Sequence, residues 1–193
     1  MSKLQELLND IKELEDRVAD EISREAEALG YRVQKGRIYF EQEVLDRHKA
    51  LAKGVSRYLA ESSLGAILTV PIIYSLLVPL ILLDIMVFLY QAICFPIYKI
   101  PKVKRSDYMT MDRHRLKYLN GIERVHCTYC SYANGVLAYA REVAARTEQY
   151  WCPIKHAKRI KTPHSRYHNF LPYGDAERYA KELDALRKKF NQK

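Results

Sequence analysis

The chain has 193 residues, a net charge of +9 and 48% hydrophobic residues. Its length allows one or two small domains. The sequence contains no Ser/His/Asp motif, Walker loop or GxGxxG glycine pattern, so it gives no basis for a hydrolase, an NTPase or a dinucleotide-dependent enzyme.

The first predicted element is an acidic amphipathic helix over residues 3–29, a region that carries four basic and nine acidic side chains. Gly30 is a plausible stop for this helix. Its apolar residues recur at spacings of three and four: Leu4, Leu7, Ile11, Leu14, Val18 and Ile22. Such a stripe indicates either a coiled coil or a helix that folds back on the protein's own core. In both cases residues 3–29 are an interaction face, and we expect a homo- or hetero-oligomer formed through it.

A small hairpin or an extended linker is predicted over Tyr31–Phe40, because apolar residues alternate around Lys35-Gly36. A second amphipathic helix is predicted over Glu41–Ala60, leading directly into an apolar stretch. Residues 1–63 therefore form the N-terminal part of the predicted architecture.

The apolar stretch runs from Leu64 to Tyr98 and contains a single charged residue, Asp84. About 20 apolar residues suffice to cross a bilayer as a helix, so residues 64–98 are predicted to be a membrane segment. A carboxylate is costly in lipid, and Asp84 should face a polar partner, water, a neighbouring subunit or the headgroup level.

The length of this segment leaves three arrangements open. A helix of 35 residues is roughly 52 Å long, against a hydrocarbon core of about 30 Å. The segment is therefore one tilted span that continues along the interface, a short helical hairpin, or a re-entrant helix-break-helix. Pro71 and Pro79 should kink the backbone, and Pro96 and Pro101 mark its exit.

The charge distribution predicts orientation and partners. Residues 99–193 carry 21 basic and nine acidic side chains, and a dense basic cluster directly follows the apolar stretch. By the positive-inside rule the C-terminal domain should lie in the cytoplasm, at the inner or cell membrane, against anionic head groups. No helix-turn-helix, zinc-finger pair or aromatic RNA-binding signature is present, which argues against nucleic acid.

Three helices are predicted in the basic domain, residues 99–193. The first covers residues 107–119 and ends at Asn120-Gly121. The second covers residues 136–151, with an apolar stripe at helical spacing. The third begins after Gly174, with Asp175 as its N-cap.

A cysteine and histidine cluster in this domain predicts a metal site. The pattern Cys127-x2-Cys130-x21-Cys152-x3-His156 supplies three thiolates and an imidazole, a common tetrahedral zinc set. The four ligands can meet only if the helix between them is short or bent. Iron is the second candidate, although a rubredoxin-like site needs a fourth cysteine where this chain has His156. Three further histidines are weaker candidate ligands: His126, His164 and His168.

Other interpretations of the cluster stay open. Cys127-Thr128-Tyr129-Cys130 followed by a helix resembles, over four residues, the active-site spacing of glutaredoxin-like proteins. That fold needs βαβ units, which residues 99–193 do not supply. The histidines His164 and His168, with Glu142 or with Asp112 and His114, suggest a second, catalytic metal site. The cysteines could also be plain core residues.

The sequence therefore predicts a mostly α protein: an N-terminal amphipathic or coiled-coil helix, a kinked hydrophobic segment, and a small basic helical domain. The expected function is a membrane-anchored interaction or assembly module whose cytoplasmic domain is stabilised by a structural metal; for the donor set above we expect zinc. The alternative is a membrane-bound metal- or thiol-dependent oxidoreductase.

Overall fold

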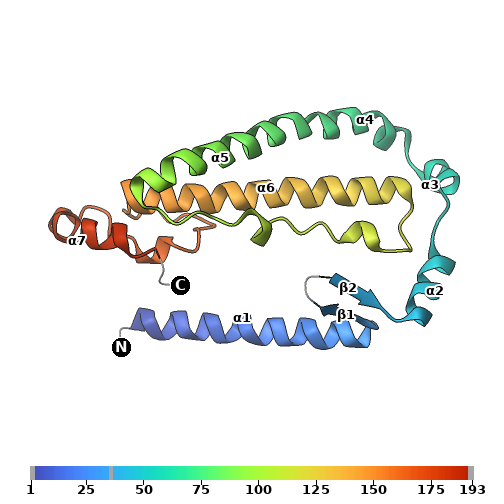
Figure 1. Ribbon diagram of the computed structural model, residues 1–193, viewed down its shortest axis with the longest axis horizontal. Helices are drawn as coiled ribbons and strands as arrows, with labels where there is room; N and C mark the ends of the chain where they lie inside the picture. The colour runs from blue at the N-terminus through green and yellow to red at the C-terminus, as the bar shows by residue number, and fades with distance from the viewer. Residues whose placement is uncertain (1–2, 35–36, 191–193) are drawn as a thin grey trace. The chain divides into compact units, whose positions relative to one another are not determined.

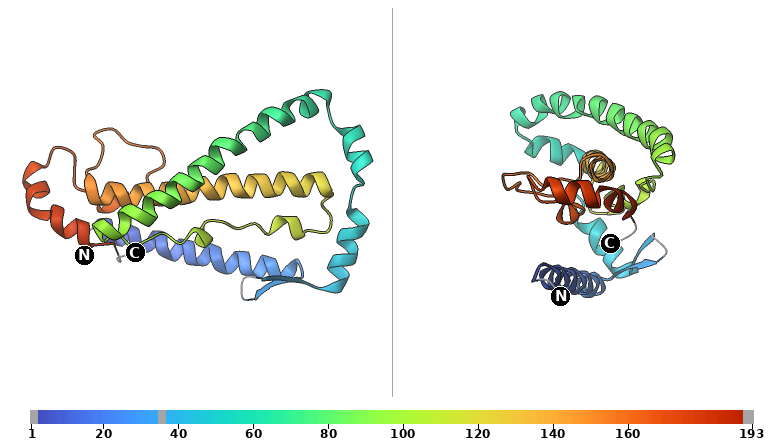
Figure 2. Two further views of the ribbon diagram at one scale, coloured as in Figure 1. Left: turned by 45° about the horizontal axis from the view of Figure 1, so that its top comes forward. Right: turned by 90° about the vertical axis from the view of Figure 1, so that its left-hand side faces the viewer.

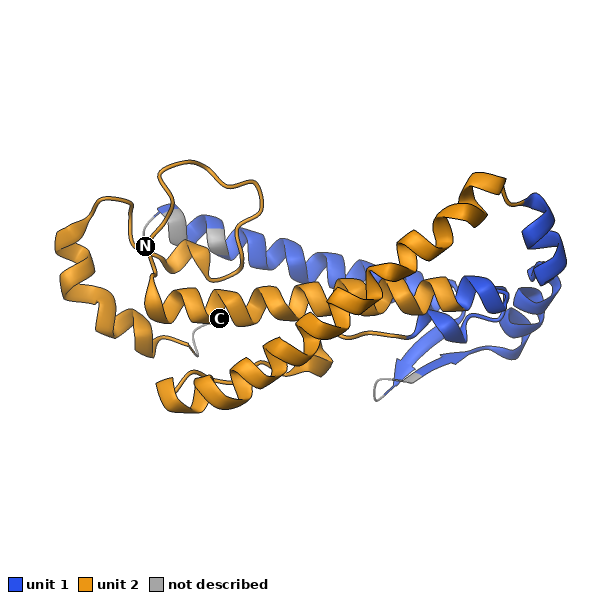
Figure 3. Ribbon diagram, turned by 90° about the horizontal axis from the view of Figure 1, so that it is seen from above, with its two compact units in different colours: residues 1–61, 112–124 blue, residues 62–111, 125–193 orange. Residues whose placement is uncertain are grey.

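The structure is a computed structural model that describes residues 3–34 and 37–190 (Figure 1). The described chain is mostly helical. Its elements are α1 (Lys3–Ala28), β1 (Tyr31–Gln34), β2 (Arg37–Phe40), α2 (Gln42–Leu51), α3 (Val55–Glu61), α4 (Leu64–Ser75), α5 (Leu77–Tyr98), α6 (Gly121–Trp151) and α7 (Ala176–Lys188). Two compact units divide the chain: residues 1–61 with 112–124, and residues 62–111 with 125–193 (Figure 3).

The N-terminal unit contains the predicted helix and hairpin. Helix α1 ends next to Gly30, whose φ of +69° is the left-handed conformation that glycine adopts at helix ends. Strands β1 and β2 pair antiparallel, with Tyr31 opposite Phe40. The predicted turn at Lys35-Gly36 and the side chain of Leu4 lie outside the described residues. The helix predicted over Glu41–Ala60 is in fact two helices, because the chain leaves helical conformation between α2 and α3.

In the second unit, α4 and α5 form one long, gently curved helix over Leu64–Tyr98 (Figures 1 and 2). The side chain of Ser63 caps α4 by accepting a hydrogen bond from the N–H of Ala66. The helix is interrupted only at Leu76, which keeps helical dihedral angles. Pro79 lies four residues after Ser75 and has no N–H to donate to its carbonyl, which explains the interruption. The helical-hairpin alternative does not fit this continuous helix.

Helix α5 ends in a left-handed residue, Lys99, whose φ is 55°. The N–H of Ile100 then donates to the carbonyl of Phe95 at 2.8 Å, the long-range bond of a Schellman motif. Residues 99–111, which we call the return segment, leave this motif. Within them only residues 105–107 form a short 3₁₀ turn. The helix predicted over 107–119 is therefore wrong: only residues 113–115 of the remainder form a further 3₁₀ turn.

Helix α6 is twice as long as the predicted helix over 136–151, because it begins at Gly121. Its start is a reciprocal capping box. The side chain of Asn120 accepts from the N–H of Glu123 at 3.0 Å, and the carboxylate of Glu123 accepts from the N–H of Asn120 at 2.8 Å. Further along, Gly135 lets the return segment approach closely, since a Cβ there would lie 2.9 Å from the carbonyl oxygen of Tyr108.

The core of this unit joins α5, the return segment, α6 and the C-terminal end. Its buried residues are Phe95, Ile100, Val103, Tyr139, Val143 and Phe190. The prediction of a final helix is confirmed: the carboxylate of Asp175 accepts from the N–H of Arg178 at 3.0 Å and caps α7. Between α6 and α7 the chain is mostly irregular and forms a bridge between Ile154 and Leu171.

Candidate functional site: an apolar helix face and the polar groups beneath it

The long helix α4–α5 has its apolar residues outside and its polar residues inside. Val78, Ile72 and Ile97 are exposed to 71%, 69% and 68%, whereas Asp84 and Gln91 are exposed to only 9% and 5%. A helix in a water-soluble protein normally shows the reverse pattern. We call twelve of the exposed apolar residues the outward face: Leu64, Ile67, Leu68, Ile72, Leu76, Val78, Leu82, Ile85, Met86, Leu89, Ile93 and Ile97.

The inward residues of α5 repeat every seven positions. Leu77, Asp84, Gln91 and Tyr98 form one row, and a second row contains Leu80, Val87 and Cys94. All of these side chains are buried or half-buried. Side chains of α6, among them Tyr132 and Tyr139, reach this first row, and two of its positions, Asp84 and Gln91, are polar.

Asp84 is held by the return segment and by α6. Both of its carboxylate oxygens accept from Arg105, at 3.0 Å from Nε and 2.6 Å from Nη2. The hydroxyl of Tyr132 donates to the same carboxylate at 3.1 Å. Burial and the bond to Asp84 raise the pKa of Tyr132 above its usual value. The expectation that Asp84 faces a polar partner is thus confirmed, and the partner is a bidentate arginine.

Gln91 fixes the return segment two turns further along α5. Its amide oxygen accepts from the N–H of Val103 at 2.9 Å, and its amide nitrogen donates to the carbonyl of Val103 at 3.2 Å. The amide nitrogen also donates to the hydroxyl of Tyr139. Burial raises the pKa of Tyr139. The side chain of Gln91 therefore satisfies backbone groups that a buried irregular segment would otherwise leave unpaired.

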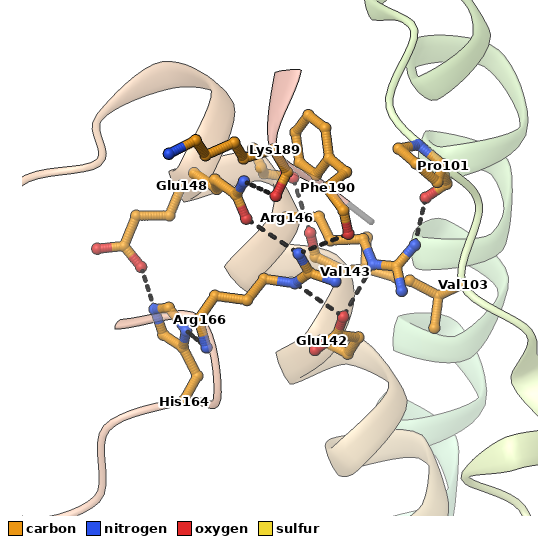
Figure 4. Close-up of polar contacts among 12 residues, drawn as sticks. Pro101, Val103, Glu142, Val143, Arg146, Glu148, His164, Arg166, Lys189 and Phe190 are labelled. Atoms are coloured by element: carbon orange, nitrogen blue, oxygen red, sulfur yellow. Dashed lines mark hydrogen bonds and ion pairs between the residues drawn. The ribbon is translucent and has the colours of Figure 1, made fainter. Parts of the chain in front are cut away.

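A second polar cluster lies at the C-terminal half of α6 (Figure 4). Glu142 accepts from Nε of Arg146 at 2.8 Å and from Nε of Arg166 at 3.0 Å. The side chains of these three residues are exposed to 11%, 16% and 14%. Arg146 also donates to the carbonyl of Pro101 at 2.6 Å, and Arg166 donates to the side chain of Gln149 at 3.0 Å. The cluster therefore ties the return segment and the C-terminal loop to α6.

The predicted metal ligands are not brought together. Cys127 and Cys130 lie in the first half of α6, and Cys152 follows its last residue. The 21 residues between Cys130 and Cys152 all belong to α6, so these cysteines are about 33 Å apart. The structure therefore does not bring Cys127, Cys130, Cys152 and His156 together, since one ion cannot reach both ends of α6. Among the described residues, no group of three or more His, Cys, Asp or Glu side chains could hold a metal ion.

Three of the candidate histidines and Glu142 have structural partners. His164 lies 3.0 Å from the carboxylate of Glu148, and the ring of His156 stacks on Tyr167. His126 contacts the ring of Tyr74, while His168 is exposed. Glu142, proposed for a second metal site, is engaged by two arginines. Cys127 is the seventh residue of α6, whereas the glutaredoxin-like motif requires a thiol at a helix N-terminus.

The sequence contained a signal that would have excluded the zinc cluster. Asn120-x-x-Glu123 is a capping-box pattern, and it places the start of a helix before Cys127. The same Asn120-Gly121 pair is also typical of a helix end, which favoured the opposite interpretation. No sequence signal paired Asp84 with Arg105, because that contact depends on the course of an irregular segment.

Comparisons with known proteins identify no relative. No protein-family model, curated protein or solved structure matches this chain significantly. The features of this chain that point to a function are the outward face of α4–α5 and the polar groups beneath it.

Proposed function

We propose that this protein attaches to a membrane through the outward face of α4–α5 and acts there as an interaction or assembly module. In this proposal the basic region, residues 99–193, lies on the cytoplasmic side against anionic head groups. Basic residues dominate this region, 21 against nine acidic ones. The described chain contains one helix that is long and apolar enough to cross a membrane, Leu64–Tyr98.

The observation that carries the proposal is the inverted polarity of α4–α5. Water-soluble monomers rarely expose a contiguous apolar patch of more than a few hundred Å². Here a dozen large apolar side chains line one face of a helix about 52 Å long. Transfer of each half-exposed leucine or isoleucine out of water contributes about 1–2 kcal/mol, so contact with lipid would be strongly favourable.

The first prediction concerns vesicle binding. Replacing Ile72 and Val78 together with lysine is expected to lower the partition coefficient onto vesicles by at least about tenfold, because two charges would enter the apolar contact. The measurement is flotation with vesicles of phosphatidylcholine and phosphatidylglycerol. Added positive charge attracts anionic lipid, so any loss must come from the apolar face.

The matched control places the same two charges elsewhere. Leu29 and Val33 are exposed to 65% and 62%, in the other unit. The Leu29→Lys/Val33→Lys variant should float like the wild type. Equal flotation of the two double variants, or a wild-type protein that stays in the aqueous phase, would refute attachment through α4–α5.

The proposed function does not include a structural metal, since the four predicted ligands lie at opposite ends of α6. The oxidoreductase alternative lacks a supporting constellation in the described residues for the same reason. Assembly, however, has a candidate element. Helix α1 exposes Leu7, Ile11, Leu14, Val18 and Ile22 to between 51% and 57%, in one stripe.

We propose that α1 pairs with α1 of a second copy of this chain. Lysine at Ile11 and Leu14 should reduce the dimer to monomer in light scattering of the detergent-solubilised protein, because it places charge in the apolar contact. The matched control is Asn9→Lys/Ser23→Lys, off the stripe.

Two acidic helices repel each other, so added salt should tighten this dimer by screening. Weaker association at high salt would instead indicate a basic partner surface.

A further inference from the structure

We infer that α4–α5 lies in the plane of one membrane leaflet, with its outward face toward the acyl chains, and does not cross the bilayer. The inference rests on the proposed function, since it assumes that the outward face meets lipid. It specifies the kind of surface that the face fits: one side of a bilayer, not its full thickness. Two parts of the protein packed along the helix carry the argument.

The first part is the return segment, which runs back beside the C-terminal half of α5. Val103 is bound to Gln91, and Arg105 to Asp84. Residues 99–105 therefore follow α5 from its end at Tyr98 to Asp84, about 21 Å along the helix axis. This segment is irregular, and its Lys102 and Lys104 side chains are exposed. An irregular backbone with charged side chains does not face lipid within the hydrocarbon core. This half of α5 therefore cannot cross the bilayer.

The second part is the N-terminal half of α6, which contacts the uncharged run Leu64–Leu83 at Ile73 and Tyr74. The hydroxyl of Tyr129 donates to the carbonyl of Ile73 at 2.9 Å, and its ring contacts the ring of Tyr74. Ile73 is the middle of that run. If the run crossed the bilayer, Tyr129 would lie near the midplane. His126, whose ring contacts that of Tyr74, would then lie at a similar depth, where an ionisable side chain is costly.

An in-plane position removes both conflicts. Leu68, Leu82 and Ile97 are exposed to 66%, 60% and 68%, and their spacings of 14 and 15 residues keep them on one face of a helix. The apolar face thus extends over nearly all of α4–α5. Interfacial helices normally carry their own charged face. Here α6 and the return segment supply the polar side instead, through Asp84, Gln91 and their partners.

The test measures the depth of three positions on the outward face. Tryptophan is placed singly at Leu68, Leu82 or Ile97, in a Trp151→Phe background that removes the chain's one native tryptophan. Each variant is reconstituted into phosphatidylcholine–phosphatidylglycerol vesicles whose lipids carry bromine at different chain positions. An in-plane helix gives three similar, shallow depths, about 5–10 Å below the headgroup boundary.

A crossing helix gives graded depths. With a span centred near Val78, Leu82 would lie about 6 Å from the midplane and Leu68 about 15 Å from it, while Ile97 would be outside the hydrocarbon. That result, in variants that still float with vesicles, overturns the in-plane inference and leaves membrane attachment standing. Absence of quenching at all three sites, together with loss of flotation of the wild type, would instead refute the proposed function.

Discussion

Replacing Glu142 with glutamine is expected to lower the free energy of unfolding by about 3 kcal/mol. The change leaves Arg146 and Arg166 with two positive charges in a nearly buried cluster and no carboxylate between them. Breaking a buried ion pair by removing one partner typically costs about 3–5 kcal/mol, because the remaining charge is not solvated. The other acceptors of these arginines, such as the carbonyl of Pro101, place the expected cost at the lower end of that range.

The measurement is urea unfolding of the protein in detergent micelles, followed by the fluorescence of Trp151, the last residue of α6. The matched control is Glu182→Gln on α7. Glu182 pairs with Arg178 at 3.0 Å, but both side chains are exposed to more than 40%. Surface ion pairs contribute little, so this variant should unfold like the wild type. Equal destabilisation by the two substitutions would contradict the role assigned to the Glu142 cluster.

A second variant separates charge imbalance from lost packing. Adding Arg166→Gln to Glu142→Gln removes one of the two uncompensated positive charges. The double variant should therefore be less destabilised than the sum of the two single variants. Simple additivity would mean that the side chains of Glu142 and Arg166 act independently, despite their 3.0 Å contact.

Local sequence signals predicted the elements whose structure depends on neighbouring residues. The periodicity of residues 3–29, the alternation around 35–36 and the cap at Asp175 specify α1, the β hairpin and the start of α7. The apolar stretch 64–98 likewise predicted a membrane-length segment, while the choice among one helix, a hairpin and a broken helix was left to the structure, which has one long helix. The hydrogen bonds of these elements join residues that are close in sequence. A local sequence pattern is therefore enough to predict them.

The return segment could not be predicted in this way. Residues 107–119 contain apolar residues at helical spacing, yet their backbone forms only short turns, such as the bond from the N–H of Met109 to the carbonyl of Arg105. The return segment that leads into them is held by contacts distant in sequence. Gln91 binds the N–H and the carbonyl of Val103, and Gly135 admits the backbone at Tyr108. These partners are 12 and 27 residues away in sequence. Tertiary contacts of this kind override local propensity, and one sequence without relatives does not disclose them.

The separation of the predicted metal ligands has a related cause. Ligand spacing suggests a metal site only if the intervening chain can bring the ligands together. A capping box at Asn120 and Glu123 begins one continuous helix, which runs past Cys127 to the residue before Cys152 and keeps the two cysteines apart. The inverted polarity of α4–α5, in contrast, follows from the apolar composition of residues 64–98 together with Asp84. The sequence located this face, and the structure identifies what packs beneath it.

Replacing Asp84 with leucine is expected to destabilise the second unit by about 2 kcal/mol, because Arg105 and Tyr132 lose their shared acceptor. The cost is smaller than at Glu142, since the side chain of Arg105 is 41% exposed and its guanidinium can regain water. Urea unfolding in detergent, again followed by Trp151 fluorescence, measures the change.

The double variant Asp84→Leu/Arg105→Leu makes this prediction specific to the ion pair. Position 84 belongs to a row that also contains Leu77, and a leucine there would continue the apolar contact between α5 and α6. Removing both charges should therefore restore most of the stability lost in the single variant, as replacement of buried ion pairs by apolar residues often does. A double variant at least as unstable as the sum of the single variants would show that Asp84 stabilises the fold by some route other than Arg105. Restored stability would show that a charge in the middle of this apolar helix is tolerated because Arg105, from the return segment, neutralises it.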